Sequence, residues 1–259
     1  MSLQRAPAVA GTFYPDDPQL LRGIIDDLLA DRAPSAQPRR VLVVPHAGYR
    51  YSAAVAALAY AELRASWAQA VERVLLLGPA HRVAVPGLAA PDCEAFVTPL
   101  GAMPLDTGLL ARLQADGLVL RSAAAHAAEH CLEVQVPFLQ VLLPQARLVP
   151  LLVGRCPPRA VTELLRRLGE DPATLIVIST DLSHYQTAAQ AERLDGETIA
   201  AIEAGAGGQL RGDAACGATV LRGLLAWQSC PPLRSLGYRH SGAVTGSDDA
   251  VVGYVACVG

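Results

Sequence analysis

Three of the six histidines in this chain of 259 residues follow closely on strongly apolar runs. The runs and their histidines are VLVVPHAGY (41–49) with His46, VLLLGPAH (74–81) with His81, and LIVISTDLSHY (175–185) with His184. Continuous apolar, β-branched runs are typical of strands covered on both faces, and open α/β sheets bind ligands beyond the carboxyl ends of such strands. The spacing therefore predicts that three imidazoles meet at one edge of a sheet, where the simplest chemistry is metal binding.

Three further residues extend this predicted site. Asp181 lies three positions before His184, where it could orient the ring, share a metal or cap a helix start. Cys216 opens an expected helix, whose N-terminus would lower the pKa of the thiol, but taken alone the residue is better interpreted as a buried, inert cysteine. Glu133 lies within an otherwise apolar stretch, which favours a partnered, inward carboxylate over a solvated acidic face.

The segment HAAEHCLE (126–133) matches the H-x-x-E-H pattern of inverted zinc peptidases. On a helix, His126 and His130 would share one face, and Glu129 and Glu133 could point into one pocket. The pattern is short and rich in alanine, and Pro137 follows soon after it. We therefore keep a zinc peptidase only as a minor alternative.

Composition excludes several classes of protein. Hydrophobic residues make up 52% and charged residues 17%, which argues against disorder, and a net charge of −3 without a dense basic patch argues against nucleic acid as a partner. The chain has no lysine, which excludes Schiff-base, pyridoxal-phosphate and P-loop chemistry. Without a signal peptide or a long apolar span, we expect a cytoplasmic protein without membrane contact, with its six cysteines reduced.

Alternating helix and strand patterns predict one three-layer α/β/α domain over 1–259, with a mixed, mainly parallel central sheet. Helices are expected over 16–32, 52–65, 105–117, 126–143, 157–170, 188–204 and 216–227. Strands are expected over 40–44, 73–77, 146–154 and 174–179, with one or two within 87–98 and an antiparallel pair at 232–240 and 249–259. Pro137 should kink the fourth helix or mark its first turn.

In combination, seven segments make the chain resemble the Memo family, also called AmmeMemoRadiSam system protein B. They are RAPAVAGTFYPDD (5–17), PHAGYRYS (45–52), LLGPAHR (76–82), TPLG (98–101), EHCLEVQVPFLQ (129–140), ISTDLSHY (178–185) and ACG (215–217). The resemblance covers almost the whole length. It implies a fold similar to that of class III extradiol dioxygenases, which open catechol rings with non-haem Fe(II).

The resemblance also implies a ligand set. Members of the family carry a metal-site-like cluster of three histidines and a cysteine, which falls here on His46, His81, His184 and Cys216. Asp181 and Glu133 also fall on matching positions, whereas His126 falls on none. Because the dioxygenases use two histidines and a carboxylate, a cysteine in this set means that ring-opening does not simply carry over.

Two classes of function follow. The first is a metal-dependent redox protein that holds Fe(II), with Cu or Zn as alternatives, in which His184 is a fourth ligand or a general acid/base assisted by Asp181 and Glu133. The second is a non-catalytic protein that binds a small-molecule or peptide ligand in a vestigial metal site. The name of the family's system adds an accessory role beside a radical-SAM protein.

Overall fold

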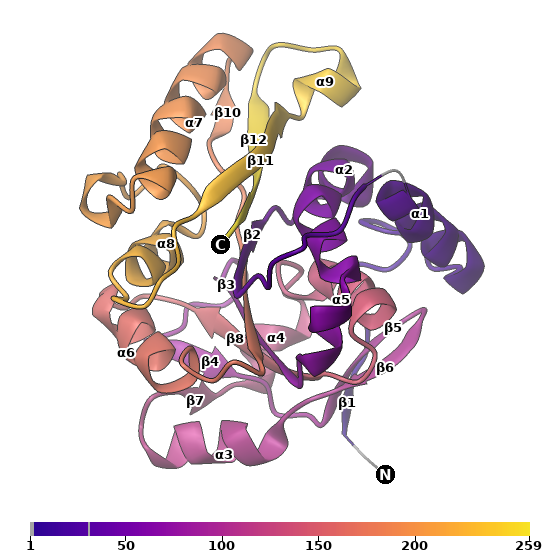
Figure 1. Cartoon of the computed structure of the whole chain (residues 1–259), viewed down its shortest axis with the longest axis vertical. Coiled ribbons are helices and arrows are strands. Elements are labelled where there is room, and N and C mark those ends of the chain that lie inside the picture. Colours follow the sequence, from indigo (N-terminus) through magenta and orange to yellow (C-terminus); the bar gives the residue numbers. More distant parts are fainter. Residues whose placement is uncertain (1–2, 31) are drawn as a thin grey trace.

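The computed structural model describes residues 3–30 and 32–259 (Figure 1). Its strands are β1 (Gln4–Arg5), β2 (Val41–Val44), β3 (Arg73–Pro79), β4 (Leu88–Ala90), β5 (Ala95–Thr98), β6 (Gly101–Pro104), β7 (Leu120–Arg121), β8 (Arg147–Val153), β9 (Thr174–Ser179), β10 (His184–Gln186), β11 (Arg234–His240) and β12 (Val251–Val258). Its α-helices are α1 (Pro18–Ala30), α2 (Tyr49–Tyr60), α3 (Thr107–Ala115), α4 (Ala123–Ala127), α5 (Val136–Leu142), α6 (Arg159–Leu168), α7 (Ala188–Glu203), α8 (Ala218–Leu225) and α9 (Gly242–Thr245). Short 3₁₀ turns cover η1 (Ala61–Arg64), η2 (Ser66–Ala70), η3 (Glu133–Gln135) and η4 (Gly207–Gln209).

One mixed sheet organises the described residues, in the order β10-β12-β2-β9-β3-β8-β4-β7, with β11 paired along β12. The central strands β2, β9, β3 and β8 are parallel, whereas β12 runs antiparallel to β2 and β4 antiparallel to β8. The predicted α/β class with a mixed sheet is therefore confirmed. Because β2, β9 and β3 are parallel neighbours, the loops that follow them leave from one edge of the sheet.

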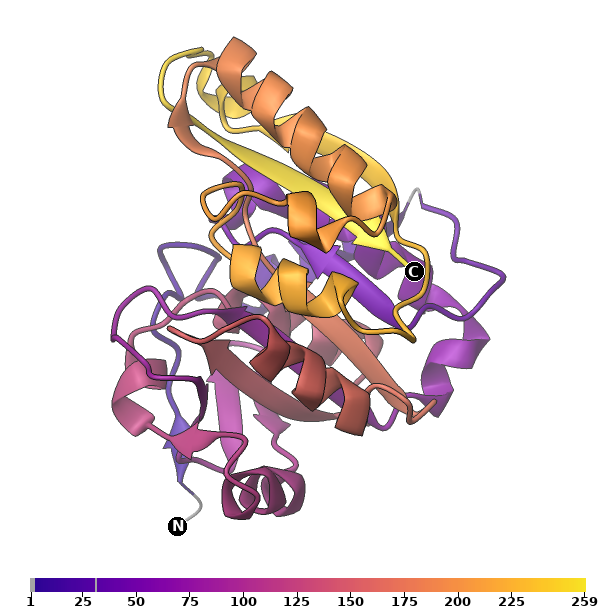
Figure 2. The same cartoon turned by 90° about the vertical axis from the view of Figure 1, so that its left-hand side faces the viewer.

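Helices cover both faces of this sheet. In Figure 1, α6, α7 and α8 lie on one side of it, and α1, α2 and α5 lie on the other. The turned view in Figure 2 shows α7 running alongside the β11–β12 pair. The central strands are apolar on both faces because both are covered, and all four residues of Val41–Val44 are fully buried. Each such side chain contributes roughly 1.5–3 kcal/mol of burial free energy, which makes the strand ends rigid supports for a site.

The segment 126–143 departs from its prediction as one helix. The structure has α4 up to Ala127, irregular backbone over 128–132, the single turn η3, and then α5 from Val136. Pro137 lies in the first turn of α5, which is one of the two positions predicted for it. The break means that His126 and His130 do not share a helix face.

The N-terminal segment forms a smaller layer against this irregular loop. β1 pairs with β5, and β5 with β6, in a separate three-stranded sheet. Leading from β1 to α1, residues 5–14 pass close to the loop 128–133 and make several buried contacts with it. Among the described residues, no helix is long and apolar enough to cross a membrane.

Candidate metal centre

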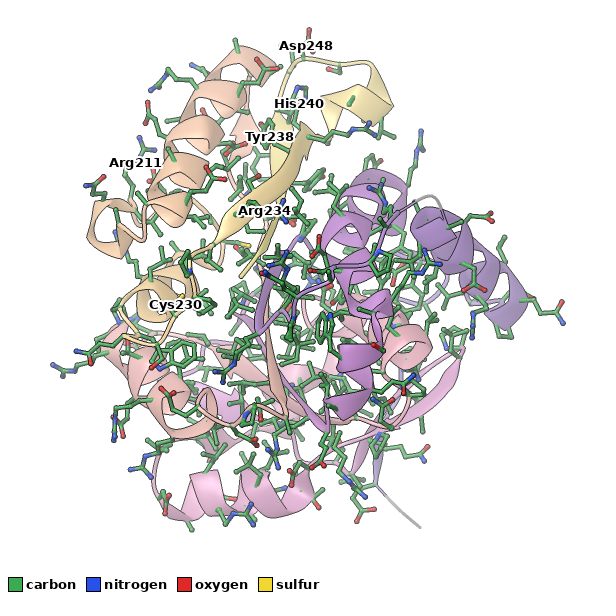
Figure 3. The ribbon with its side chains drawn as sticks, in the orientation of Figure 1. Arg211, Cys230, Arg234, Tyr238, His240 and Asp248 are labelled. Carbon is green, nitrogen blue, oxygen red and sulfur yellow. The ribbon has the colours of Figure 1, made fainter. Side chains whose placement is uncertain are left out.

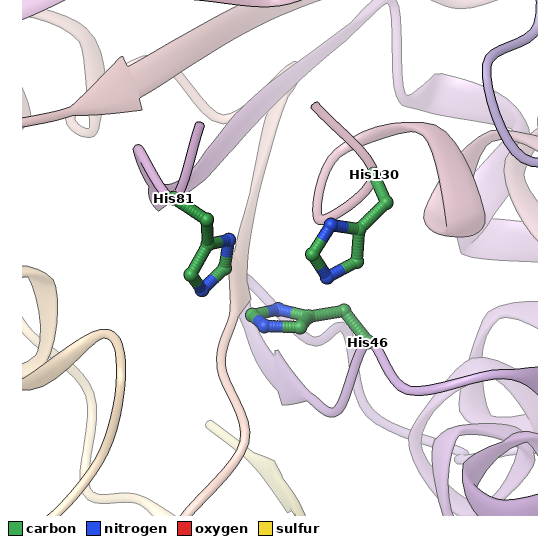
Figure 4. Close-up of side chains that lie close together, drawn as sticks. All are labelled: His46, His81 and His130. Atoms are coloured by element: carbon green, nitrogen blue, oxygen red, sulfur yellow. The ribbon is translucent and has the colours of Figure 1, made fainter. Parts of the chain in front are cut away.

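Three imidazole rings converge beyond the carboxyl ends of β2 and β3: those of His46, His81 and His130 (Figure 4). One nitrogen atom of each ring lies within 4.8 Å of the corresponding atoms of the other two. The ring centroids of His81 and His130 are 4.9 Å apart and nearly stacked, and the His46 ring meets both edge-on at 5.2 and 5.5 Å. Convergent imidazole nitrogens are the kind of group that holds a transition metal.

The His46 ring is fixed by Ser179 at the end of β9. The Ser179 hydroxyl donates to the Cys131 carbonyl at 2.6 Å and accepts a hydrogen bond from Gln135 Nε2 at 2.8 Å. Its remaining lone pair lies 3.0 Å from His46 Nδ1, so this nitrogen must be the donor. His46 Nε2 is therefore unprotonated and free to act as a ligand.

The His81 ring is fixed by a carboxylate. Glu129 Oε1 lies 2.9 Å from His81 Nδ1, and the Glu129 carboxylate also accepts hydrogen bonds from the backbone N–H groups of His81, Arg82, His130 and Cys131. Burial alone would raise the pKa of Glu129, but the hydrogen bonds from His81 outweigh it and bring that pKa to about 2. An ionised Glu129 only accepts, so His81 Nδ1 carries a proton, and Nε2 is the nitrogen left to bind a metal, the arrangement usual for metal-binding histidines.

His130 is the ring of the three whose Nδ1 lacks a hydrogen bond among the described residues. Its Nδ1 lies 3.3 Å from Glu129 Oε1 but, among the described residues, makes no hydrogen bond of good geometry although it is buried. Phe13 from the N-terminal segment packs on the ring at a centroid distance of 5.0 Å. Burial lowers the pKa of His130 to about 4, so the ring is neutral at pH 7.

The surroundings of His46 and His130 favour the neutral form of these two rings. Burial lowers the pKa of His46 well below its ordinary value, and the neighbouring His81 and His130 lower it further. Neutral imidazole is the form that ligates a metal, so the free protein holds these rings ready for binding without first losing protons from them.

Cys216 contacts the same cluster through His46. Its Sγ lies 3.3 Å from His46 Nε2 and accepts a hydrogen bond from the Asp181 backbone N–H at 3.2 Å. Gly217 allows this approach, since a Cβ there would lie 2.7 Å from Thr180 Oγ1. Burial raises the pKa of Cys216 to about 12 because desolvation outweighs the helix dipole, so of the two interpretations from sequence the buried cysteine fits and the lowered pKa does not.

The model of the Memo-like protein family matches residues 5–258. A MEMO1 family protein of Methanothermobacter thermautotrophicus is 34% identical over 279 residues, covering 96% of this chain and 98% of that protein. A MEMO1 family protein of Aquifex aeolicus is 34% identical over 203 residues, covering 77% of this chain and 74% of that protein. The chain belongs to the Memo family. A further relative, the memo-1 homolog of Caenorhabditis elegans, is 34% identical over 70% of this chain and 53% of its own length.

The structure of this Memo-family protein brings together some of the residues predicted from sequence. His46 and His81 lie in the cluster, and Cys216 touches His46. His184 does not belong to the group within 4.8 Å: its ring lines a cavity next to Cys216. His184 Nδ1 lies 2.8 Å from the Leu182 carbonyl, which can only accept, so its Nε2 is also unprotonated.

A bulge directs His184 toward that cavity. His184 pairs with Val252 and Gln186 with Val251, which leaves Tyr185 as an extra residue with a left-handed φ of 57°. This conformation is strained for a tyrosine and puts its side chain outward, 77% exposed. The consequence is that His184 and Gln186 both line the cavity.

Asp181 and Glu133 do not contact the His184 side chain. Asp181 accepts a hydrogen bond from the His46 backbone N–H at 2.7 Å and caps no helix, so it positions His46 instead. Burial raises the pKa of Asp181 to about 7 despite this bond. Glu133 is fully buried and accepts hydrogen bonds from the Arg5 side chain, two backbone N–H groups and the Tyr14 hydroxyl. Direct catalytic use of either carboxylate remains a prediction.

The sequence analysis missed His130 as a member of the cluster and Glu129 as the carboxylate that holds the His81 ring. Both belong to the H-x-x-E-H pattern, but that pattern was interpreted on a helix, with His126 as the second histidine. In the structure His126 is buried elsewhere, with Nε2 2.9 Å from the Ala89 carbonyl. Glu129-His130 after an irregular break, beside a strand-end histidine, was the signal that could have found them.

Proposed function

We propose that this Memo-family protein binds a transition metal at His46, His81 and His130 and acts as a metal-dependent redox protein. The observation that carries the proposal is the convergence of three imidazole nitrogens within 4.8 Å of one another. Two of these rings also have their Nδ1 proton committed to Ser179 or Glu129. An oriented ring needs little further ordering when a metal binds.

The chemistry of the donor set fits the group. Imidazole suits iron, copper and zinc, and a nearby sulfur favours the softer of these ions. We propose Fe(II) first, with Cu or Zn as alternatives. Cys216 lies close enough to His46 to join as a ligand once deprotonated, and since burial holds its pKa near 12, metal loading that recruits this thiol should release a proton.

The protein's own residues would divide the remaining work. A bound iron or copper ion supplies one-electron redox chemistry. Glu129 holds the His81 ring, Ser179 holds the His46 ring, and the His46 side is closed to solvent at 2% exposure. The His81 side chain is 28% exposed and marks the open approach. His184, with its unprotonated Nε2 on the adjacent cavity, can accept a proton from a molecule bound there.

Metal content is the test. The full chain, purified anaerobically without a metal-binding tag, should contain near-stoichiometric iron or copper by elemental analysis. His81→Ala and His130→Ala should lose it, and Cys216→Ser should weaken its retention. His240→Ala is the matched control, because His240 lies on β11 outside the cluster and pairs with Glu192. Absence of metal in the wild-type protein after reconstitution would overturn the proposal.

A turnover measurement distinguishes a redox enzyme from a protein that binds its ligand without reaction. Oxygen uptake by the iron-loaded protein, measured with a panel of catechols and thiols, should exceed that of His81→Ala. Stoichiometric metal without uptake would favour a site that binds a small molecule or peptide without reacting with it. Co-purification of a radical-SAM protein would instead favour an accessory role.

A further inference from the structure

The His184 ring is held by a single peptide group, the one that joins Leu182 to Ser183. His184 Nδ1 donates to the Leu182 carbonyl at 2.8 Å. The N–H group of the same peptide belongs to Ser183 and donates to Asp195 Oδ1 at 2.9 Å. The ring, the peptide and the carboxylate therefore form one continuous chain of hydrogen bonds, in which both hydrogens point towards Asp195.

Asp195 is costly at its position. It lies inside α7, although aspartate is a poor helix former, and it is fully buried. Both of its donors are neutral: the Ser183 N–H and, at 2.8 Å from Oδ2, the hydroxyl of Tyr238, which extends from β11 towards α7 (Figure 3). Since an apolar residue would fill a purely structural position at lower cost, the carboxylate points to a use.

The backbone of β12 is fitted to this carboxylate. Gly253 packs against Asp195, and a Cβ there would collide with Oδ2. The same glycine accepts from the Leu182 N–H at 2.8 Å and donates to the Ser183 carbonyl at 2.9 Å, which holds the chain on both sides of the 182–183 peptide. A turn of this peptide about its own axis would present the Ser183 N–H to His184 in place of a carbonyl, and the bond to Asp195 opposes that turn.

The charge of Asp195 also reaches the ring through the peptide. A hydrogen bond with one charged partner is roughly twice as strong as a neutral one, and bonds in a chain strengthen one another by about 10–30% each. We infer that Asp195 is a positioning residue for His184, which acts through the 182–183 peptide to keep the proton on Nδ1 and to leave Nε2 unprotonated. The inference rests on the proposed function only for the use of Nε2 as a proton acceptor.

Asp195→Asn tests the inference, because it removes the charge and keeps the shape. Its amide oxygen can still accept from the Ser183 N–H, and its NH₂ group can donate to the Tyr238 hydroxyl. ¹H–¹⁵N NMR of the imidazole groups, in the full chain freed of metal by chelation, reports both ring nitrogens, and loss of the signal in His184→Gln assigns it. Wild type should be protonated at Nδ1. In Asp195→Asn the Nδ1–H resonance should move upfield, and the ratio of Nδ1–H to Nε2–H tautomers should fall about two- to fivefold.

Tyr238→Phe separates the charge of Asp195 from its structural support. It removes the other donor to the carboxylate and leaves the charge to Ser183 alone, so the Nδ1–H resonance should move downfield, opposite to Asp195→Asn. If Asp195 only supported the fold, both variants would loosen one contact and shift the resonance in the same direction. Glu192→Gln is the control, because it removes a charge from a side chain of α7 that is 63% exposed, and it should leave the resonance in place.

Three results would overturn the inference: a wild-type ring protonated only at Nε2, an unchanged ring in Asp195→Asn, or shifts of the same sign in Asp195→Asn and Tyr238→Phe. Failure of the proposed function is distinguishable, because metal content is measured on the same preparations before chelation. Expected shifts in a protein that never holds metal keep the role of Asp195 and lose the metal site. Metal without these shifts keeps the metal site and loses the role of Asp195.

Discussion

Glu129 and Glu133 lie four residues apart in one segment, and both are almost completely buried, yet their surroundings differ completely. Glu129 faces the histidines and holds the His81 ring. Glu133 faces the N-terminal segment and pairs with Arg5 at 2.7 Å, with no group of the metal centre among its hydrogen-bond partners. The irregular backbone between them, in place of a helix, turns the two carboxylates to different partners.

The contrast separates a carboxylate that tunes a site from one that builds its support. Arg5, which Glu133 neutralises, also donates to the backbone carbonyls of His126 and Glu129 at 2.7 and 2.6 Å. The Arg5–Glu133 pair therefore fixes the shape of the loop that carries His130. Loss of Glu133 should act on folding, and loss of Glu129 should act on metal binding.

Glu133→Gln should have the largest effect. It leaves the Arg5 guanidinium buried without a counter-charge, which typically costs about 3–5 kcal/mol of unfolding free energy. Chemical denaturation of the metal-free protein measures it. Glu163→Gln, which alters an exposed ion pair on α6, is the control and should change little. A Glu133→Gln protein as stable as wild type would show that Glu133 does not support the fold.

Glu129→Gln should act mainly on the metal. Replacing a carboxylate that orients a ligand histidine typically lowers metal affinity about 10- to 100-fold, or roughly 1.4–2.7 kcal/mol. Competition with a chromophoric chelator measures the affinity. Glu62→Gln, which removes the charge from the Arg39–Glu62 ion pair in a distant part of the sequence, serves as control. Equal affinity in the Glu129→Gln and control proteins would show that the His81 ring does not depend on this carboxylate.

Tyr14→Phe should sharpen the comparison by removing one donor from Glu133 and leaving the other three. The hydroxyl lies 2.6 Å from Glu133 Oε1, and we expect a loss of about 1.5 kcal/mol of unfolding free energy, since the acceptor is charged. Metal affinity should be unchanged. Tyr185→Phe, at an exposed tyrosine, is the matched control in the same denaturation experiment.

Acidification should give the smallest effect, and His130 contributes a defined share of it. The pKa of His130 is about 4 in the folded protein against an ordinary value of 6.5, so the unfolded chain binds more protons between these values. Its stabilising contribution is then complete above about pH 6.5 and is lost as the pH falls toward 4. Between pH 7 and pH 6 the metal-free protein should lose about 0.5–1 kcal/mol through His130, and His130→Gln should remove this share. A variant with the same pH dependence as wild type would contradict it.

The predictable parts of this molecule are those that local pattern controls. The buried strands and the positions of His46 and His81 after them follow from apolar runs, because strand ends in a parallel sheet leave from one edge. The prediction of one helix over 126–143 was wrong. The backbone of this segment is held by the Arg5 side chain, which lies more than one hundred residues earlier in the chain. No local periodicity encodes such a contact.

The two interpretations of Cys216 could not be separated by local sequence for a related reason. Its place before α8 suggested a lowered pKa, a local effect. The packing of Asp181, Thr180 and His46 around the sulfur removes it from water and reverses the sign. Position along the chain could place this thiol near the site, but only tertiary burial determines its protonation.

Because β12 lies between β10 and β2, the sheet is completed only when this last strand has been synthesised. His46 and β2 leave the ribosome long before β12 is made, and translation at about 5–20 residues per second makes that interval roughly 10–40 s. Throughout it, the β2 edge that β12 will cover stays open, which is when a nascent chain is most exposed to aggregation and to chaperone capture. Residue Gly253 of the same strand then fastens the Leu182–Ser183 loop beside Cys216 and His184. The segment beside Cys216 and His184 therefore reaches its final packing only after β12 has been made.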